Sequence, residues 1–208
     1  MKPITHKYSS LIKLIVLVII SIQSAIPANA EQIDVGIFDS NHQSADIAIK
    51  IIPDFEIPGE QTITNIIYTI RWPESFGEME FYYGFDPEQL YLVPTDGDAV
   101  LSQGYYYQRF NAVTSTNVGE TISAGEEVLL STHTITVGTF DCASFEIVDN
   151  EWTQSNNGGP YFEVGGVNKT GDIYEPILYF GTAGGYVTGG STITLGQSTG
   201  TLTLEEYQ

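Results

Sequence analysis

Carboxylates are the side chains of this sequence that could carry out catalysis. Glu78 and Glu80 lie two residues apart in GEMEFYYGF, so a strand would place both on one face, and Glu146 follows in SFEIV. Glycoside hydrolysis needs two carboxyl groups held roughly 5 to 10 Å apart. The chain carries 26 Asp and Glu, so such a spacing also arises by chance. A small glycoside hydrolase is therefore kept as a second alternative, and no residue is predicted to be catalytic.

The stretch TDGDAV could contribute to a calcium site, because Asp96 and Asp98 flank Gly97. Ca²⁺ takes about six to eight oxygen ligands, and two carboxylates with nearby carbonyl groups supply fewer than that. An Asp-Gly turn without an ion explains the same residues. The sequence therefore predicts no cofactor, and it leaves a structural calcium ion at Asp96 and Asp98 open.

Four aromatic side chains could form a surface that binds carbohydrate. An exposed ring can stack on the apolar face of a pyranose while polar neighbours bond to its hydroxyl groups. The candidates are Tyr82, Tyr105, Tyr107 and Trp152. In QGYYYQRF, Tyr105 and Tyr107 alternate with Tyr106, and Trp152 lies in the polar, loop-like stretch NEWTQSNNGGPY. Tyr is also a common strand residue, so a purely structural role stays open for these side chains.

Other reactive groups are few. After residue 30 the sequence has only His42 and His133, and its single cysteine is Cys142. A zinc site needs about four converging ligands, which these distant residues do not offer. The sequence contains no Gly-x-Ser-x-Gly motif. We expect Cys142 to be a buried, unreactive thiol, and His133 to be a noncatalytic strand residue that is either packed or exposed on the surface.

The elements that must position these residues are strands, because alternating polar and apolar residues dominate after residue 30. Ile47, Ile49 and Ile51 share one face of a strand that Pro53 ends. Further strands are expected in EEVLLSTHTITVG, SFEIV, DIYEPILYFG, STITLG and TLTLEEY. No stretch shows a helical period, and DPEQLYLV is interpreted as one turn leading into a short strand. About ten such strands, each with one apolar face, predict two antiparallel sheets packed face to face.

The stretch TITNIIYTIRWP, residues 62–73, is the clearest strand. Trp72 shares a face with Ile66, Tyr68 and Ile70, so the pattern predicts a core position for the indole. Arg71 lies on the opposite face. We expect its guanidinium to meet an acidic side chain on a neighbouring strand.

The first 30 residues have the layout of a secretory signal peptide. Basic residues come first, an apolar run follows at residues 14–22, and Ala28 and Ala30 form a small-x-small cleavage signal. The apolar run is shorter than the roughly 20 residues of a membrane-spanning helix. We therefore expect export, cleavage after Ala30, and a single secreted or cell-surface β-sandwich domain at residues 31–208.

Charge narrows the range of partners. The chain has 7 Lys and Arg against 26 Asp and Glu, a net charge of −19. Such a balance repels nucleic acid and anionic membranes, so neither is expected as a partner. With 42% hydrophobic and 12% aromatic residues, the chain is not expected to be disordered.

The order of these stretches resembles that of cohesin-like modules of bacterial cell-surface and scaffold proteins. DVGIFDSNHQSADIAIKI, a strand with Tyr and Trp, GFDPEQL, GEEVLLSTHTITVG and SFEIVD follow one another within residues 33–180. The resemblance implies an all-β, noncatalytic sandwich with jelly-roll or immunoglobulin-like layers, used for attachment to another extracellular protein or for adhesion. The same fold group includes several carbohydrate-binding modules, so glycan binding on exposed aromatics is the first alternative. No ligand-contact residue follows from the resemblance.

Overall fold

The computed structural model of the chain describes residues 30–40, 46–84, 86–137, 143–180 and 186–187. The chain divides into two units, residues 1–31 and 32–208, and the described strands and helices all lie in the second unit. Several predictions fall outside the described residues. They are the signal peptide, His42, Cys142 and the strands expected at STITLG and TLTLEEY.

Five strands form the first sheet, in the order β11-β1-β2-β7-β4. Their bounds are β1 Ile33–Asp39, β2 Asp46–Pro53, β4 Glu80–Tyr83, β7 Val128–Val137 and β11 Thr170–Glu175. Three of the four pairings are antiparallel, whereas β1 and β11 run parallel. The sequence predicted antiparallel pairing throughout. The parallel pair joins two strands far apart in the chain, which is the kind of connection that parallel pairing requires.

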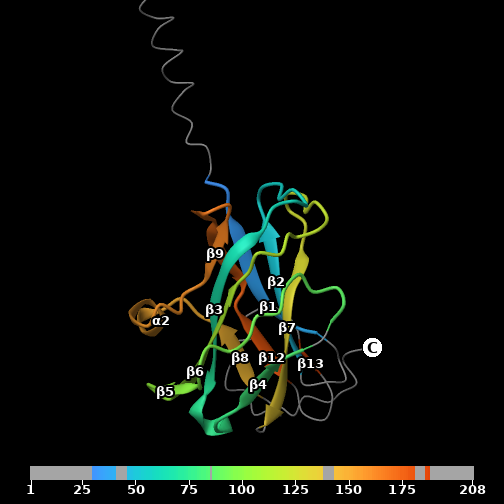
Figure 1. Ribbon diagram of the computed structural model, residues 1–208. Helices are drawn as coiled ribbons and strands as arrows, with labels where there is room; N and C mark the ends of the chain where they lie inside the picture. The colour runs from blue at the N-terminus through green and yellow to red at the C-terminus, as the bar shows by residue number, and fades with distance from the viewer. Residues whose placement is uncertain (1–29, 41–45, 85, 138–142, 181–185, 188–208) are drawn as a thin grey trace, which may run out of the picture. The chain divides into compact units, whose positions relative to one another are not determined.

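The second sheet is built around β3, Ile63–Pro73, and lies against the first (Figure 1). β6 pairs with one side of β3, and β9 and β8 pair with successive parts of the other side. β5 extends the sheet beyond β6, β10 lies beside β9, and β12 and β13 follow β8. The bounds are β5 Val100–Ser102, β6 Tyr105–Val113, β8 Ser144–Ile147, β9 Tyr161–Val164, β10 Val167–Asn168, β12 Ile177–Phe180 and β13 Tyr186–Val187.

Pro176 divides a segment that the sequence predicted as one strand. Glu175 before it pairs with Gly36 in the first sheet, and Ile177 after it pairs with Glu146 in the second sheet. Proline has no backbone N–H and restricts the residue before it, so it interrupts a ladder. The chain therefore passes from one sheet to the other at Pro176.

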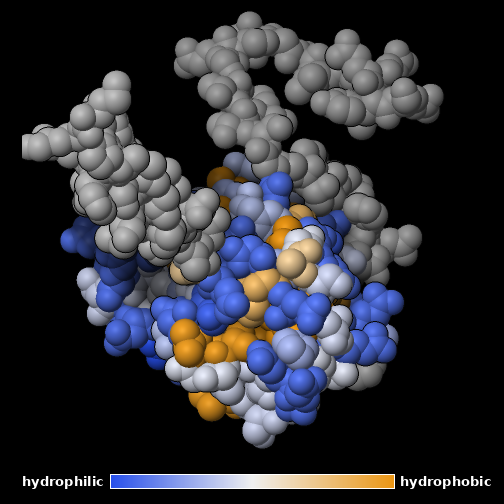
Figure 2. All heavy atoms as spheres, turned by 90° about the horizontal axis from the view of Figure 1, so that it is seen from above, coloured by the Kyte–Doolittle hydropathy of each residue, from blue (hydrophilic) through white to orange (hydrophobic). Residues whose placement is uncertain are grey.

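Apolar side chains from both sheets fill the space between them. The fully buried residues include Ile47, Ile49 and Ile51 of β2 and Ile66, Tyr68, Ile70 and Trp72 of β3. The Trp72 ring packs on Phe81 and Phe145 of other strands, and its Nε1 donates a hydrogen bond to the Gly77 carbonyl (2.9 Å). Hydrophilic residues predominate on the described surface seen in Figure 2. The predicted two-sheet sandwich and the core position of Trp72 are confirmed.

Within the described residues, two short helices interrupt the strands, and the sequence predicted neither. The 3₁₀-helix η1 spans Glu74–Phe76 and the α-helix α2 spans Glu151–Ser155. Asn150 caps α2: its side chain accepts from the N–H groups of Trp152 and Thr153, and Thr153 Oγ1 accepts from the Asn150 N–H. The capping box holds a helix too short to show a helical period. In the described ranges, no helix is long and apolar enough to cross a membrane.

The stretch DPEQLYLV contains the expected turn but not the expected strand. The N–H groups of Leu90 and Tyr91 bond to the carbonyls of Leu129 and Leu130 at the start of β7. This short contact follows β7 without forming a regular ladder, which explains why no strand results.

Candidate functional site

Residues 149–159, which include α2, fold over the outer face of the second sheet. The Trp152 ring stacks on the Tyr107 ring, with centroids 4.3 Å apart and planes inclined by 18°. Thr69 Oγ1 donates a hydrogen bond to the Gly158 carbonyl at 2.6 Å. Tyr107 and Thr69 are therefore buried even though both lie on the face that points away from the core.

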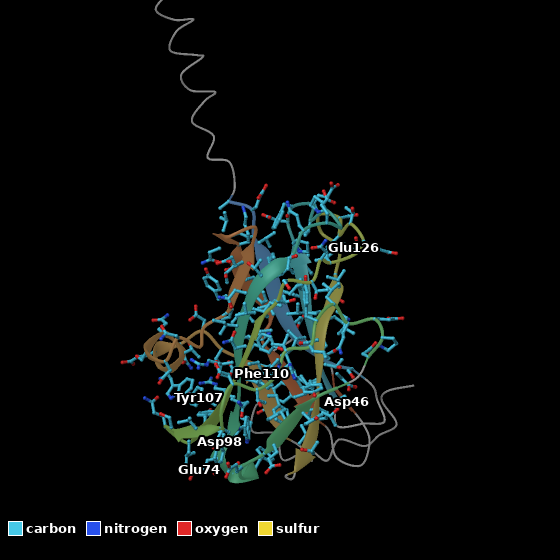
Figure 3. The ribbon with its side chains drawn as sticks, in the orientation of Figure 1. Asp46, Glu74, Asp98, Tyr107, Phe110 and Glu126 are labelled. Atoms are coloured by element: carbon cyan, nitrogen blue, oxygen red, sulfur yellow. The ribbon has the colours of Figure 1, made fainter. Side chains whose placement is uncertain are left out.

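The covering segment, residues 149–159, changes the exposure of the predicted aromatic residues. Figure 3 shows Tyr107 on the side of the sheet toward α2, whereas Phe110 points into the sandwich. The facing derived from the sequence is therefore correct. However, Tyr107 is only 2% exposed, because Trp152 covers its ring. The structure brings Trp152 and Tyr107 together as a stacked pair, and their role in ligand binding stays a prediction.

Arg71 lies beside this pair, on the adjacent strand. Its Nε and Nη2 both donate to one carboxylate oxygen of Glu146, Oε2, at 2.7 and 2.6 Å. The two residues are register partners on β3 and β8, so the predicted acidic cross-strand neighbour of Arg71 is confirmed. The Tyr105 ring lies 4.4 Å from Arg71 Cζ, a cation–π distance. These contacts fix the guanidinium on both its edge and its face.

The charge of Arg71 is also stabilised. Partial burial lowers the pKa of the guanidinium, but the interactions with the neighbouring Tyr107 and Glu146 side chains outweigh this, so that the pKa is raised overall. Trp152, Tyr107 and Arg71 thus form a chain of contacts. The predicted aromatic residues support a charged group that the sequence had assigned only to a salt bridge.

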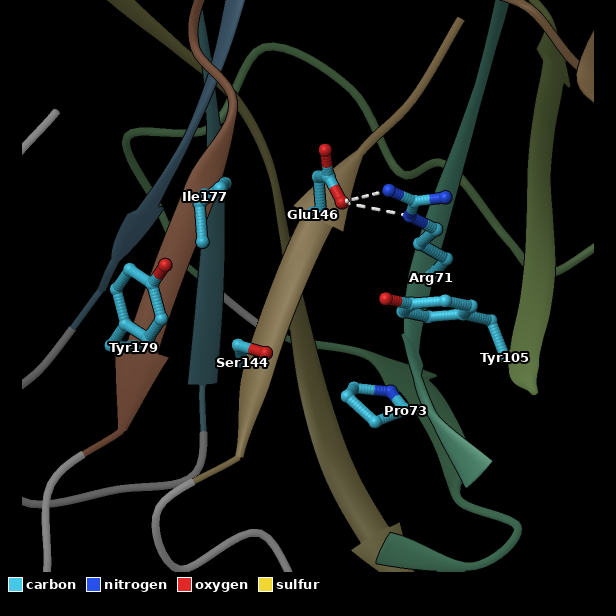
Figure 4. A pocket seen from close by; sticks show the side chains of 7 residues that line it. All are labelled: Arg71, Pro73, Tyr105, Ser144, Glu146, Ile177 and Tyr179. Atoms are coloured by element: carbon cyan, nitrogen blue, oxygen red, sulfur yellow. Dashed lines mark hydrogen bonds and ion pairs between the residues drawn. The ribbon is translucent and has the colours of Figure 1, made fainter. Parts of the chain in front are cut away.

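A hollow of about 180 Å³ opens next to the ion pair, and we call it the Arg71 pocket. Figure 4 shows Arg71 and Tyr105 on one wall, Ile177 and Tyr179 on the other, and Ser144 and Glu146 between them. The full lining is Arg71, Pro73, Tyr105, Ser144, Glu146, Ile177 and Tyr179. Tyr179 is 45% exposed. The pocket thus combines an open aromatic ring, a hydroxyl group and a fixed ion pair.

The remaining predicted residues lie elsewhere. Tyr82 is on β4 at the edge of the first sheet, 57% exposed, and its ring stacks on Tyr83 with centroids 4.4 Å apart. Asp96 pairs with Arg109, whose Nη2 lies 2.7 Å from Asp96 Oδ2. Asp98 is exposed. In the part of the chain that is described, no group of three or more His, Cys, Asp or Glu side chains could hold a metal ion. Calcium at Asp96 and Asp98 stays a prediction.

The candidate catalytic carboxylates are divided between two hollows. Glu146 lines the Arg71 pocket, whereas Glu78 and Glu80 line a second hollow of about 190 Å³ together with Asp98. Glu78 and Glu80 are both exposed, next to the buried Met79, as the strand pattern predicted. The structure does not bring Glu146 into the same hollow as either of the other two.

Sequence reasoning missed Ser144, Ile177 and Tyr179 as members of a site. Tyr179 lies between Leu178 and Phe180, which are both buried, so the alternation in ILYF does predict that its ring points outward. The pairing of β12 with β8, which places Tyr179 opposite Ser144 and Ile177 opposite Glu146, is a long-range contact without a local signal.

The sequence matches no protein-family model and no curated protein. Among solved structures, the chain is similar to a cohesin module of a family 33 glycoside hydrolase from Clostridium perfringens, with a TM-score of 0.34 and 9% identity over 74% of this chain and 96% of that one. It is also similar to a CBM3 of Hungateiclostridium clariflavum, with a TM-score of 0.31 and 13% identity over 77% and 99% of the two chains.

A third similarity is to a GH20 exo-β-N-acetylglucosaminidase from Vibrio harveyi, with a TM-score of 0.21 and 12% identity; it covers 70% of this chain but only 18% of that one. The first two proteins belong to the two classes that the sequence resembles. All three TM-scores lie below 0.5, so these similarities assign neither a family nor a ligand to the chain.

Proposed function

We propose that this protein is an exported, noncatalytic module that binds carbohydrate in the Arg71 pocket. The observation that carries the proposal is the meeting, in one hollow, of the partly exposed Tyr179 ring with the Arg71–Glu146 ion pair and the Ser144 hydroxyl. A sugar offers an apolar ring face and several hydroxyl groups, and it needs both kinds of partner. Small-ligand sites generally combine apolar walls with a few fixed polar groups.

Each side chain has a role in this proposal. The Tyr179 ring stacks on the sugar. The Arg71 guanidinium, already fixed by Tyr105 and Glu146, donates hydrogen bonds to sugar oxygens. Both bonds from Arg71 end on Oε2 of Glu146, and the described residues give Oε1 no partner, so Oε1 can accept from a sugar hydroxyl. A prearranged pair of this kind loses little conformational entropy on binding.

The lining favours binding over hydrolysis. Among the described residues of the Arg71 pocket, Glu146 is the only carboxylate, and its neighbour is a guanidinium. Glycoside hydrolysis uses a pair of carboxyl groups flanking the scissile bond. Glu78 and Glu80, which could supply a second group, line the other hollow.

A glycan array tests the proposal, with the purified residues 31–208 and two variants. We expect binding to one class of glycans, loss of at least about tenfold in affinity for Tyr179→Ala, and little change for Tyr82→Ala, a matched exposed tyrosine on the other sheet. An array without signal, or a signal that survives Tyr179→Ala, contradicts the proposal.

Attachment to another extracellular protein, the first hypothesis from the sequence, is kept as a second candidate. In the described part of the chain β5 pairs only with β6, and its Val100 and Leu101 are both about half exposed. An edge strand with apolar side chains can accept a strand of a partner protein. This candidate would be favoured if the wild type captured one defined partner protein, Leu101→Lys abolished the capture, and the glycan array gave no signal.

A further inference from the structure

We infer that the Arg71 pocket takes a single neutral sugar unit at the end of a glycan chain. The inference rests on the proposed function and names its ligand class. Its first basis is size. The pocket volume of about 180 Å³ is smaller than the roughly 300 to 1,000 Å³ of pockets for drug-sized ligands. Tyr105 and Tyr179 stand on opposite walls (Figure 4), so the space between them suits one ring rather than a row of rings.

The second basis is that the sheet face next to the pocket is covered at one end. Thr69 precedes Arg71 by two residues on the same face of β3, and a longer glycan that followed the strand would cross it next. Instead, Thr69 is fully buried and donates to the Gly158 carbonyl. The chain leaving β8 starts this cover, since the Val148 N–H bonds to the Thr69 carbonyl just before α2. A glycan cannot continue along the sheet in that direction.

The aromatic side chains point to the same conclusion. A flat polymer surface is bound by several coplanar exposed rings in a row. Here the Tyr107 ring is covered by Trp152, and Arg71 occupies one face of the Tyr105 ring. Among the described residues lining the pocket, Tyr179 is the more exposed of the two aromatic side chains, at 45%. One open ring stacks on one sugar unit.

The third basis is charge. Arg71 is the only cation among the described residues of the pocket, and Glu146 already neutralises it at 2.6 Å. The chain as a whole carries a net charge of −19. The negative charge of the protein would repel an acidic sugar, and the described residues of the pocket offer no unpaired cation for the carboxylate of that sugar. The pocket therefore favours neutral sugars over uronic acids.

Two-dimensional NMR titrations of isotope-labelled residues 31–208 test the inference, because NMR detects weak binding. The probes are neutral hexoses, a pentose and N-acetylhexosamines, the corresponding uronic acids, and oligomers of one to six units of the best sugar. We expect amide shifts at Ser144, Ile177 and Tyr179. Uronic acids should bind at least about tenfold more weakly than the corresponding neutral sugars. The affinity for oligomers should rise by less than about threefold when their length increases from two to six sugar units.

The outcomes separate the inference from the proposed function. Affinity that rises with every added unit, equal binding of uronic acids, or binding to an insoluble polysaccharide that monosaccharides do not displace would overturn the single-unit inference and leave carbohydrate binding standing. No shift with any sugar, combined with an array without signal, would overturn both. Tyr179→Ala, a variant of a half-exposed side chain, should lose the shifts while its remaining spectrum stays that of the folded protein.

Discussion

The Trp152 indole lies stacked on the Tyr107 ring, with centroids 4.3 Å apart, and Tyr107 lies opposite Arg71 in the pairing of β6 with β3. Two residues that the sequence predicted as an open surface for sugar binding are thus packed against each other, next to Arg71. Trp152 acts on the Arg71 pocket from outside it, because it is not among the residues that line the hollow.

Replacing Trp152 by Ala should therefore affect stability more than binding. The loss of the stacked pair uncovers Tyr107, and we expect the free energy of unfolding to fall by about 1 to 2 kcal/mol. Affinity for the array ligand should fall less than in Tyr179→Ala. Urea denaturation and the binding isotherm measure the two effects. A stable Trp152→Ala protein that no longer binds sugar would make Trp152 itself the ligand ring.

The cap of α2 gives a second test of the cover. Asn150 accepts two backbone N–H groups at the start of the helix. Asn150→Ala should cost about 0.5 to 2 kcal/mol, as expected for the loss of an N-cap. Because Trp152 follows Asn150 by two residues, its fluorescence should shift to the red. Asn168→Ala, at the last residue of β10, is the control and should leave the emission unchanged. An unchanged spectrum in Asn150→Ala would mean that the cap does not hold the cover.

Trp72 tests the core. Its side chain is fully buried and stacks on Tyr106 with centroids 5.6 Å apart. Trp72→Ala should lower the free energy of unfolding by about 3 to 5 kcal/mol, the usual cost of such a cavity. Equilibrium denaturation by urea measures this, with the exposed Leu92→Ala as control, for which about 0.5 kcal/mol or less is expected. A Trp72→Ala protein as stable as the wild type would contradict the packing described for β3.

His133 makes the fold sensitive to acid. It is fully buried between the sheets, where its Nε2 bonds to the Tyr68 hydroxyl at 2.5 Å, and burial lowers its pKa to about 3. Below about pH 6.5 the unfolded chain takes up a proton at this residue and the folded chain does not. Stability should therefore fall as the pH drops from about 6.5 to about 3, by on the order of 1.4 kcal/mol per unit at most from this group.

Other groups also titrate in this range, so the test compares the pH dependence of stability in the wild type with that in a variant of His133. His133→Gln keeps a polar side chain next to Tyr68 and Ser131 and cannot take up the proton. The variant should show a shallower loss of stability between pH 6 and pH 4 than the wild type, measured by urea denaturation at each pH. Parallel curves for the two proteins would show that His133 is not the source.

The strands that could be predicted are those whose burial depends on local alternation. β2 and β3 follow the period of two so regularly that the core position of Trp72 and the outward direction of Arg71 could be derived from neighbouring residues alone. A predicted acidic partner for Arg71 also followed from the composition, because 26 Asp and Glu surround so few cations. That the partner is Glu146 depends on the pairing of β3 with β8, which carries no local signal.

The exposure of the candidate site could not be predicted for the same reason. Tyr107 lies on the outer face as expected, yet residues that follow it by more than 40 positions cover it, since Trp152 lies on a helix held by its cap rather than by a repeating pattern. Likewise, Tyr179 and Glu146 line the same pocket only because the chain passes into the second sheet at Pro176. Local patterns determine the direction of a side chain, whereas segments far away in the sequence determine whether that side chain is buried or exposed.

The most direct test of carbohydrate binding in the Arg71 pocket is isothermal titration of the strongest array glycan into the wild type, Tyr179→Phe and Tyr179→Ala. We expect Tyr179→Phe to bind within about threefold of the wild type, because it keeps the ring, and Tyr179→Ala to lose at least about tenfold, or about 1.4 kcal/mol. Wild-type affinity in Tyr179→Ala, with the protein folded, would contradict the site.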